Sequence, residues 1–211
     1  MVVATDRLRL AELSVARLCH ELSGVIGTIS AALDLLKSQT ATRGEAATLA
    51  DDAADELVSR LRLLRAAWGP DTPDLTLAEA RTLCLGLEAN RRVTIDWTRL
   101  PPETVFSARI GRLILNLVML ACESIPDRGS VLLDGSADDL FVRPVSPRAA
   151  WPAALSAALI DLPALDATNS DPRDLQTMVT VLQAAAAGAT LSLPIGLGTR
   201  GGAAPLRLLA P

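Results

Sequence analysis

The chain has 211 residues, half of them hydrophobic, but only two Phe, three Trp and no Tyr, so its core must consist mainly of aliphatic side chains. This length suits one or two domains, and a net charge of −4 gives no basic footprint, so it disfavours both nucleic acid and anionic membranes as partners. The three scattered cysteines form neither a disulfide framework nor a metal-ligand pattern, and no signal peptide or membrane span is recognisable. We therefore expect a reduced, cytoplasmic protein.

The first predicted element is a long helix with an apolar seam along one side. Its seam residues step by four and three, as a and d positions do in a helical bundle, and they are Ala11, Val15, Leu18, Leu22, Val25, Ile29, Ala32 and Leu36. At about 100° per residue, His20 points roughly 160° away from Leu18 and Leu22. The only histidine of the chain is therefore predicted to face solvent.

Two further features surround His20. Glu21 follows it directly, and a carboxylate can hold one ring nitrogen protonated while the other stays free as a nucleophile. Gly24, Gly27 and Ala31 share the face of His20 and leave it nearly bare, although glycine weakens a helix by about 1 kcal/mol relative to alanine. An isolated exposed histidine is often only solvated surface, but this combination favours a functional site that another molecule approaches closely.

A second helix is predicted to pair with the first. It repeats the seam with Ala46, Ala50, Ala53, Leu57, Leu61, Leu64 and Trp68, and the two helices are joined near residues 39–44. Such a hairpin cannot enclose its own core, because half of each apolar stripe still faces water. We therefore expect two hairpins to form a four-helix bundle in a two-fold homodimer. The alternative is that the stripes pack against the second region of the same chain.

The second region follows a segment rich in proline and glycine at residues 69–74 and alternates helix and strand patterns. Thr76 and Glu79 form a capping box that opens the first of its helices. The expected helices cover 76–90, 107–124 and 171–188, and the expected strands cover 92–97, 131–133, 140–145, 190–193 and 206–209. Helices layered on one mixed sheet predict an α/β fold for this region.

Several sequence motifs resemble those of bacterial phosphotransfer proteins. The segment Cys19-His20-Glu21-Leu22 and the apolar stretch after it resemble the H-box of sensor histidine kinases. Residues 17–21, with Gly27 and residues 32–36, 60–69, 95–97 and 113–117, are more similar to the ChpT-type histidine phosphotransferases. The resemblance implies a mixed α+β protein with a helical-hairpin dimerisation and phosphotransfer domain at residues 1–70. It also implies an α/β sandwich at residues 75–211 that resembles a degenerate histidine-kinase ATP-binding domain.

The resemblance also indicates which nucleotide-binding residues are missing. Asn116 matches the first asparagine of the kinase pattern, but Leu120 occupies the place of the asparagine that holds magnesium, and an aliphatic side chain cannot bind Mg²⁺. No Asp-x-Gly-x-Gly adenine box continues from residues 132–137. The motif Gly196–Gly201 satisfies Gly-x-Gly-x-x-Gly but is not placed between a strand and a helix, so we interpret it as a hairpin loop. No cofactor is expected in this chain, and Mg²⁺ would come with a partner.

The resemblance implies reversible phosphoryl transfer between His20 and aspartates of response-regulator receiver domains, with a hybrid histidine kinase upstream. His20 would accept the phosphoryl group. Glu21 would orient the imidazole of His20 and act as its general base. The residues expected to dock the receiver are Ser23, Gly24, Gly27, Thr28 and Ala31, with Glu56, Ser59 and Arg60 as weaker candidates. Gly24 stands where phosphatase-competent kinases have an amide or hydroxyl, so little phosphatase activity is expected. The alternatives are a non-catalytic dimeric adaptor and an active sensor histidine kinase, against which Leu120 argues.

Overall fold

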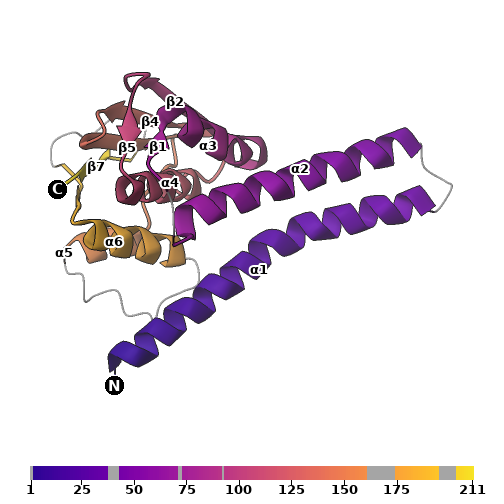
Figure 1. Cartoon of the computed structure of the whole chain (residues 1–211), viewed down its shortest axis with the longest axis horizontal. Coiled ribbons are helices and arrows are strands. Elements are labelled where there is room, and N and C mark those ends of the chain that lie inside the picture. The colour runs from indigo at the N-terminus through magenta and orange to yellow at the C-terminus, as the bar shows by residue number, and fades with distance from the viewer. Residues whose placement is uncertain (1, 38–42, 71–72, 92, 161–173, 195–202) are drawn as a thin grey trace. The chain divides into compact units, whose positions relative to one another are not determined.

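The computed structural model describes residues 2–37, 43–70, 73–91, 93–160, 174–194 and 203–211 (Figure 1). The architecture is mixed α+β, with an N-terminal helical hairpin and a C-terminal sheet covered by helices. The chain divides into two compact units, Met1–Arg62 and Leu63–Pro211. This boundary falls within the second helix, so the last six residues of that helix belong to the C-terminal unit. The domain limits expected from the sequence, 1–70 and 75–211, stay a prediction.

The hairpin consists of α1 (Val2–Lys37) and α2 (Arg43–Trp68), which lie side by side in Figure 1. The predicted seam is only partly covered. Its buried members in these two helices are Val25, Ala32, Ala46, Ala53 and Leu64. In contrast, Val15 is 60% exposed and Leu61 is 44% exposed, although both are seam positions. The single chain therefore leaves part of each apolar stripe in contact with solvent, as expected for a hairpin that cannot enclose a core.

The C-terminal unit contains a five-stranded sheet with the order β2 (Val93–Arg99), β4 (Gly129–Gly135), β5 (Asp139–Val145), β7 (Leu206–Leu209) and β6 (Thr190–Ser192). β2 and β4 run parallel, and the other neighbours run antiparallel. Alternate residues of each central strand are buried, as in a sheet with one covered face. The five strands predicted from alternation are confirmed, with ends that differ by a few residues.

Helices α3 (Leu77–Arg91), α4 (Ala108–Glu123), α5 (Ala153–Ile160) and α6 (Leu175–Ala187) complete this unit (Figure 1). α4 is buried on nearly all sides, as its apolar sequence predicted. α3 begins with the predicted capping box: the Thr76 amide donates to Glu79 Oε2 at 2.9 Å, and the Glu79 amide donates to Thr76 Oγ1 at 3.2 Å. Hydrogen bonds from Thr76 lower the pKa of Glu79. Among the described residues, no helix is both long and apolar enough to cross a membrane.

Three elements or features were not predicted. α5 was missed, and so was the short antiparallel pair of β1 (Leu75–Thr76) and β3 (Val105–Phe106). Gly111 of α4 is required by this pair, because a Cβ at that position would lie 2.8 Å from the Cβ of Leu75.

The predicted end of α6 at Gly188 is confirmed, because Gly188 caps the helix with a φ of 71°. The predicted start of that helix at residues 171–172 and the motif Gly196–Gly201 lie outside the described residues.

Candidate functional site

His20 lies near the middle of α1 and is exposed, as its helical phase predicted. Cys19 and Ser23 beside it are also exposed, and Leu22 on the opposite side of the helix is half-buried. Because His20 and its neighbours Cys19 and Ser23 are exposed, the imidazole is accessible to a large partner, which a phosphoacceptor histidine requires.

The other two cysteines are buried, and burial raises the pKa of the Cys84 thiol well above its ordinary value.

Glu21 is held by two arginines from different helices. Arg17 Nε donates to Glu21 Oε1 at 2.8 Å along α1, and Arg60 of α2 donates through Nη1 to Glu21 Oε2. Arg60 Nη1 also approaches the backbone oxygen of Glu21 at 3.3 Å, and its Nη2 lies 3.7 Å from Glu56 Oε1. The side chains of Glu21 and Arg60 are 18% and 20% exposed, so this network is only partly screened by water. It joins α2 to α1 at Glu21, the residue that directly follows His20 in the sequence.

This network changes how the role of Glu21 must be understood. Both carboxylate oxygens accept hydrogen bonds from arginines, and each retains a further lone-pair position. The expected action of Glu21 on the imidazole tautomer stays a prediction, and it would have to use one of those remaining positions. Sequence reasoning gave Arg17 no role, although its spacing of four residues from Glu21 is a helical ion-pair signal. The pairing of Glu21 with Arg60 had no local signal, because 39 residues separate them.

The face of α1 that carries His20 has only small side chains at the positions that follow it and is open to solvent. A Cβ added to Gly24 or Gly27 would meet nothing within 4 Å. The hydroxyls on this face donate to their own helix, Ser23 Oγ to the Cys19 carbonyl at 2.6 Å and Thr28 Oγ1 to the Gly24 carbonyl at 3.2 Å. Ala31 is also exposed, whereas the α2 candidates Glu56, Ser59 and Arg60 are half-buried. The structure thus presents a smooth helical surface suited to close packing of another backbone.

The two positions relevant to nucleotide binding lie inside the C-terminal unit. Asn116 and Leu120 of α4 are both completely buried. Asn116 is surrounded by protein hydrogen-bond partners, and Leu120 belongs to the apolar core. Among the described residues, no group of three or more His, Cys, Asp and Glu side chains could hold a metal ion.

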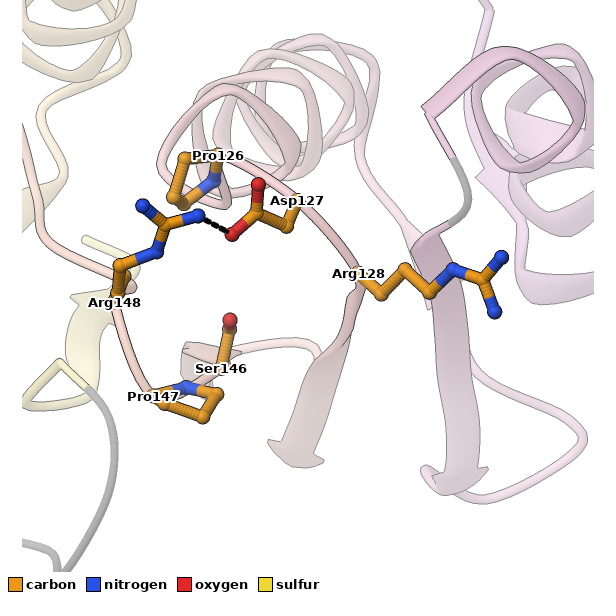
Figure 2. A pocket seen from close by; sticks show the side chains of 6 residues that line it. All are labelled: Pro126, Asp127, Arg128, Ser146, Pro147 and Arg148. Atoms are coloured by element: carbon orange, nitrogen blue, oxygen red, sulfur yellow. Dashed lines mark hydrogen bonds and ion pairs between the residues drawn. The ribbon is translucent and has the colours of Figure 1, made fainter.

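A separate surface pocket of about 560 Å³ lies where the chain enters β4 and leaves β5 (Figure 2). Asp127 and Arg148 on its rim form an ion pair with each other, and Arg128 points away from the hollow (Figure 2). Ser146 contributes a hydroxyl, and two prolines complete the lining. Because its paired charges neutralise one another, this pocket presents no concentrated charge to a ligand, and the exposed face around His20 is the stronger candidate.

One family model and one solved structure agree with the fold of this chain. The family model of the histidine phosphotransferase C-terminal domain matches residues 77–197. A solved structure of a bacterial phosphotransferase aligns with 97% of this chain and 96% of its own, at 21% identity and a TM-score of 0.72. Full-length ShkA in complex with AMPPNP (17% identity, 94% of this chain and 45% of that one, TM-score 0.44) is less similar. A histidine kinase from Burkholderia phymatum STM815 is also less similar (18% identity, 98% of this chain and 97% of that one, TM-score 0.38). No curated protein matches significantly in sequence.

Proposed function

This chain belongs to the histidine phosphotransferase family defined by that C-terminal domain, and we propose that it carries phosphoryl groups between receiver-domain aspartates through His20. The observation that carries the proposal is the exposure of the only histidine above a bare helical face. The neighbouring carboxylate of Glu21 is fixed by Arg17 and Arg60, so the surroundings of His20 are organised before a partner arrives.

The proposed chemistry is a reversible transfer between nitrogen and oxygen. An unprotonated ring nitrogen of His20 attacks the phosphorus of an aspartyl phosphate; the N–P bond forms while the O–P bond breaks, and the carboxylate leaves. Attack by the aspartate of a second receiver reverses these steps and restores the imidazole. Because the transition state is loose, positioning and charge stabilisation supply most of the catalysis, and the receiver would bring the Mg²⁺. The other ring nitrogen, which carries the proton, would donate a hydrogen bond to the Glu21 carboxylate.

We further propose that the protein acts as a homodimer. The seam residues Val15 and Leu61 are exposed in the single chain, and so are Leu8, Ile26 and Leu33 of α1. A second hairpin placed on these side chains would bury them and complete a four-helix bundle. Its partners would be receiver domains and an upstream hybrid histidine kinase.

The direct test is to look for phosphohistidine. The protein is incubated with a phosphorylated receiver domain and then digested and analysed by mass spectrometry under basic conditions, which preserve the N–P bond. We expect one phosphoryl group on the peptide that contains His20. If no receiver of the source organism transfers phosphate to His20, the non-catalytic adaptor becomes the better interpretation.

Gly27→Leu tests the docking face without altering the nucleophile. Because nothing lies within 4 Å of the added Cβ, the helix should be stabilised by about 1 kcal/mol, as leucine is a better helix former. Receiver docking should nevertheless weaken, and the KM for the phosphorylated receiver should rise about tenfold or more through steric conflict with the partner. Gly44→Leu is the matched control, because it is equally open but lies in the first turn of α2. An unchanged KM in Gly27→Leu would show that this face does not dock the receiver.

A nucleotide test separates the proposed transferase from an active kinase. We expect calorimetry with millimolar ATP and Mg²⁺ to detect no saturable binding, because Leu120 is buried in the core and offers no oxygen to a metal. Labelled ATP should likewise leave His20 unlabelled when no kinase is added. Saturable binding of ATP would show that the C-terminal domain retains a nucleotide site elsewhere.

A further inference from the structure

The guanidinium of Arg60 is held by carboxylates from both helices of the hairpin. Its Nη1 donates to Glu21 Oε2 of α1 and lies 3.3 Å from the backbone oxygen of the same residue. Its Nη2 lies 3.7 Å from Oε1 of Glu56, which precedes it by four residues on α2, a spacing that favours helical ion pairs. These residues all belong to the compact unit Met1–Arg62. Glu56 thus helps to place Arg60 where it meets both polar groups of Glu21.

The carboxylate of Glu21 is held at both of its oxygens. Arg17 donates to Oε1 from within α1, and Arg60 donates to Oε2 from α2. Rotation of the carboxylate would lengthen both bonds, and hydrogen bonds between ionised groups are about twice as strong as those between neutral groups. Because Glu21 directly follows His20, this fixed orientation determines which of its remaining lone-pair positions are open to the imidazole.

Packing of the hairpin does not require this ion pair. The side chains of Glu21 and Arg60 are largely removed from water, and the loss of hydration offsets most of the attraction between their charges. Apolar residues of the same volume would stabilise the contact between the helices equally well or better. The adjacent seam positions, Leu22 and Leu57, do carry apolar side chains. The orientation that the ion pair imposes on Glu21 therefore explains its presence better than stability does.

We propose that Arg60 is a positioning residue for phosphotransfer: it fixes the carboxylate of Glu21, which in turn sets the tautomer and orientation of the His20 imidazole. This inference rests on the function proposed above. It gives Arg60 a role different from receiver docking, for which the sequence made it a weaker candidate. Arg60 acts on the reaction only through Glu21, so its effect must vanish when the Glu21 carboxylate is absent.

The test measures transfer kinetics on the full-length protein. Arg60→Met removes the donors and keeps an apolar stem of similar length, and Arg60→Gln, with a polar side chain, is the variant to use should Arg60→Met fail to fold. Arg62→Met is the matched control: it removes the same charge two residues further along α2. Arg62 is exposed and is not one of the arginines that hold Glu21 in the described part of the chain.

At saturating phosphorylated receiver, the transfer rate constant of Arg60→Met should fall about tenfold, a partial loss because Arg17 still holds one oxygen of Glu21. The KM should change less than about twofold, because the docking face on α1 is intact. Arg60→Lys should recover most of the rate, since an ammonium group can still donate to the carboxylate. Arg62→Met should match the wild type in both quantities.

A double-mutant cycle shows whether Arg60 acts through Glu21. Glu21→Ala alone should lower the transfer rate constant about 100-fold, the usual minimum for loss of a general base. Adding Arg60→Met to Glu21→Ala should change the rate constant by less than about twofold further, because residues that act through one another are not additive.

The tautomer of His20 can be observed without any receiver. His20 is the only histidine, so nitrogen-15 spectra of the labelled protein contain one pair of ring nitrogens, and their shifts give the ratio of the two neutral tautomers. One tautomer should predominate in the wild type. In Arg60→Met the ratio should move at least about twofold toward that of Glu21→Ala, and in Arg62→Met it should stay unchanged.

Four results would overturn the inference. They are a wild-type rate constant in Arg60→Met, a raised KM with an unchanged rate constant, an equal loss in the presence and absence of the Glu21 carboxylate, and an unchanged tautomer ratio. The second of these would assign Arg60 to receiver docking instead. Failure of the proposed function looks different, because the wild-type protein itself would then accept no phosphate. In that case the role in phosphotransfer is overturned too, while the tautomer ratio still shows whether Arg60 acts on His20.

Discussion

His20→Ala is expected to abolish phosphate relay between receiver domains completely. His20 is the only histidine of the chain, so no second imidazole can replace it. Its side chain is exposed, and substitutions at exposed positions without special contacts change the free energy of unfolding by less than about 0.5 kcal/mol. Folding and self-association should therefore survive, and the loss should be purely chemical. The measurement is transfer of labelled phosphate from one purified receiver to another with the protein in catalytic amount.

Cys19→Ser is the matched control for that experiment. Cys19 is the exposed neighbour of His20 and carries the other nucleophilic side chain at this position of α1. The variant should relay phosphate at the wild-type rate. Relay that persists in folded His20→Ala, or that disappears in Cys19→Ser, would contradict the assignment of His20 as the phosphoacceptor.

Val15→Asp is expected to convert a dimer of about twice 22.1 kDa into a folded monomer. Val15 occupies the apolar seam but is 60% exposed in the single chain, so a carboxylate there costs little in an isolated hairpin. In a four-helix bundle, the same carboxylate would be buried without a partner in each of the two protomers. An uncompensated buried charge costs about 3–5 kcal/mol, which is enough to prevent association at micromolar concentration. Sedimentation equilibrium gives the mass, and circular dichroism reports whether the helices remain.

Leu85→Asp provides the comparison, because Leu85 is 59% exposed on α3 and does not belong to the seam. This variant should sediment like the wild type. A wild-type protein that is monomeric at micromolar concentration would remove the dimer proposal and favour the alternative, in which the stripes pack against the chain's own second region.

Local patterns in the sequence were enough to determine the elements that repeat over a few residues. The spacing of four and three residues between apolar positions places His20 opposite the seam. The Thr76–Glu79 capping box begins α3, and the alternation of apolar and polar residues locates the strands of the sheet. These features depend on neighbours within one or two turns of a helix or a few residues of a strand, so chain order alone specifies them. The short β1–β3 pair was missed because its two strands have two residues each and lie about thirty positions apart.

The tertiary structure decided which partners the polar residues have. Glu21 meets Arg60 across 39 residues, and Asn116 meets Trp68 and Gln183 across 48 and 67 residues. No periodicity encodes such pairs, because they exist only after the helices are placed against one another. The sequence therefore determined that His20 is exposed on a one-sided helix. Only the fold decided that two arginines hold Glu21 and that a buried amide holds the end of α2, because hydrogen-bond partners follow from distance in space.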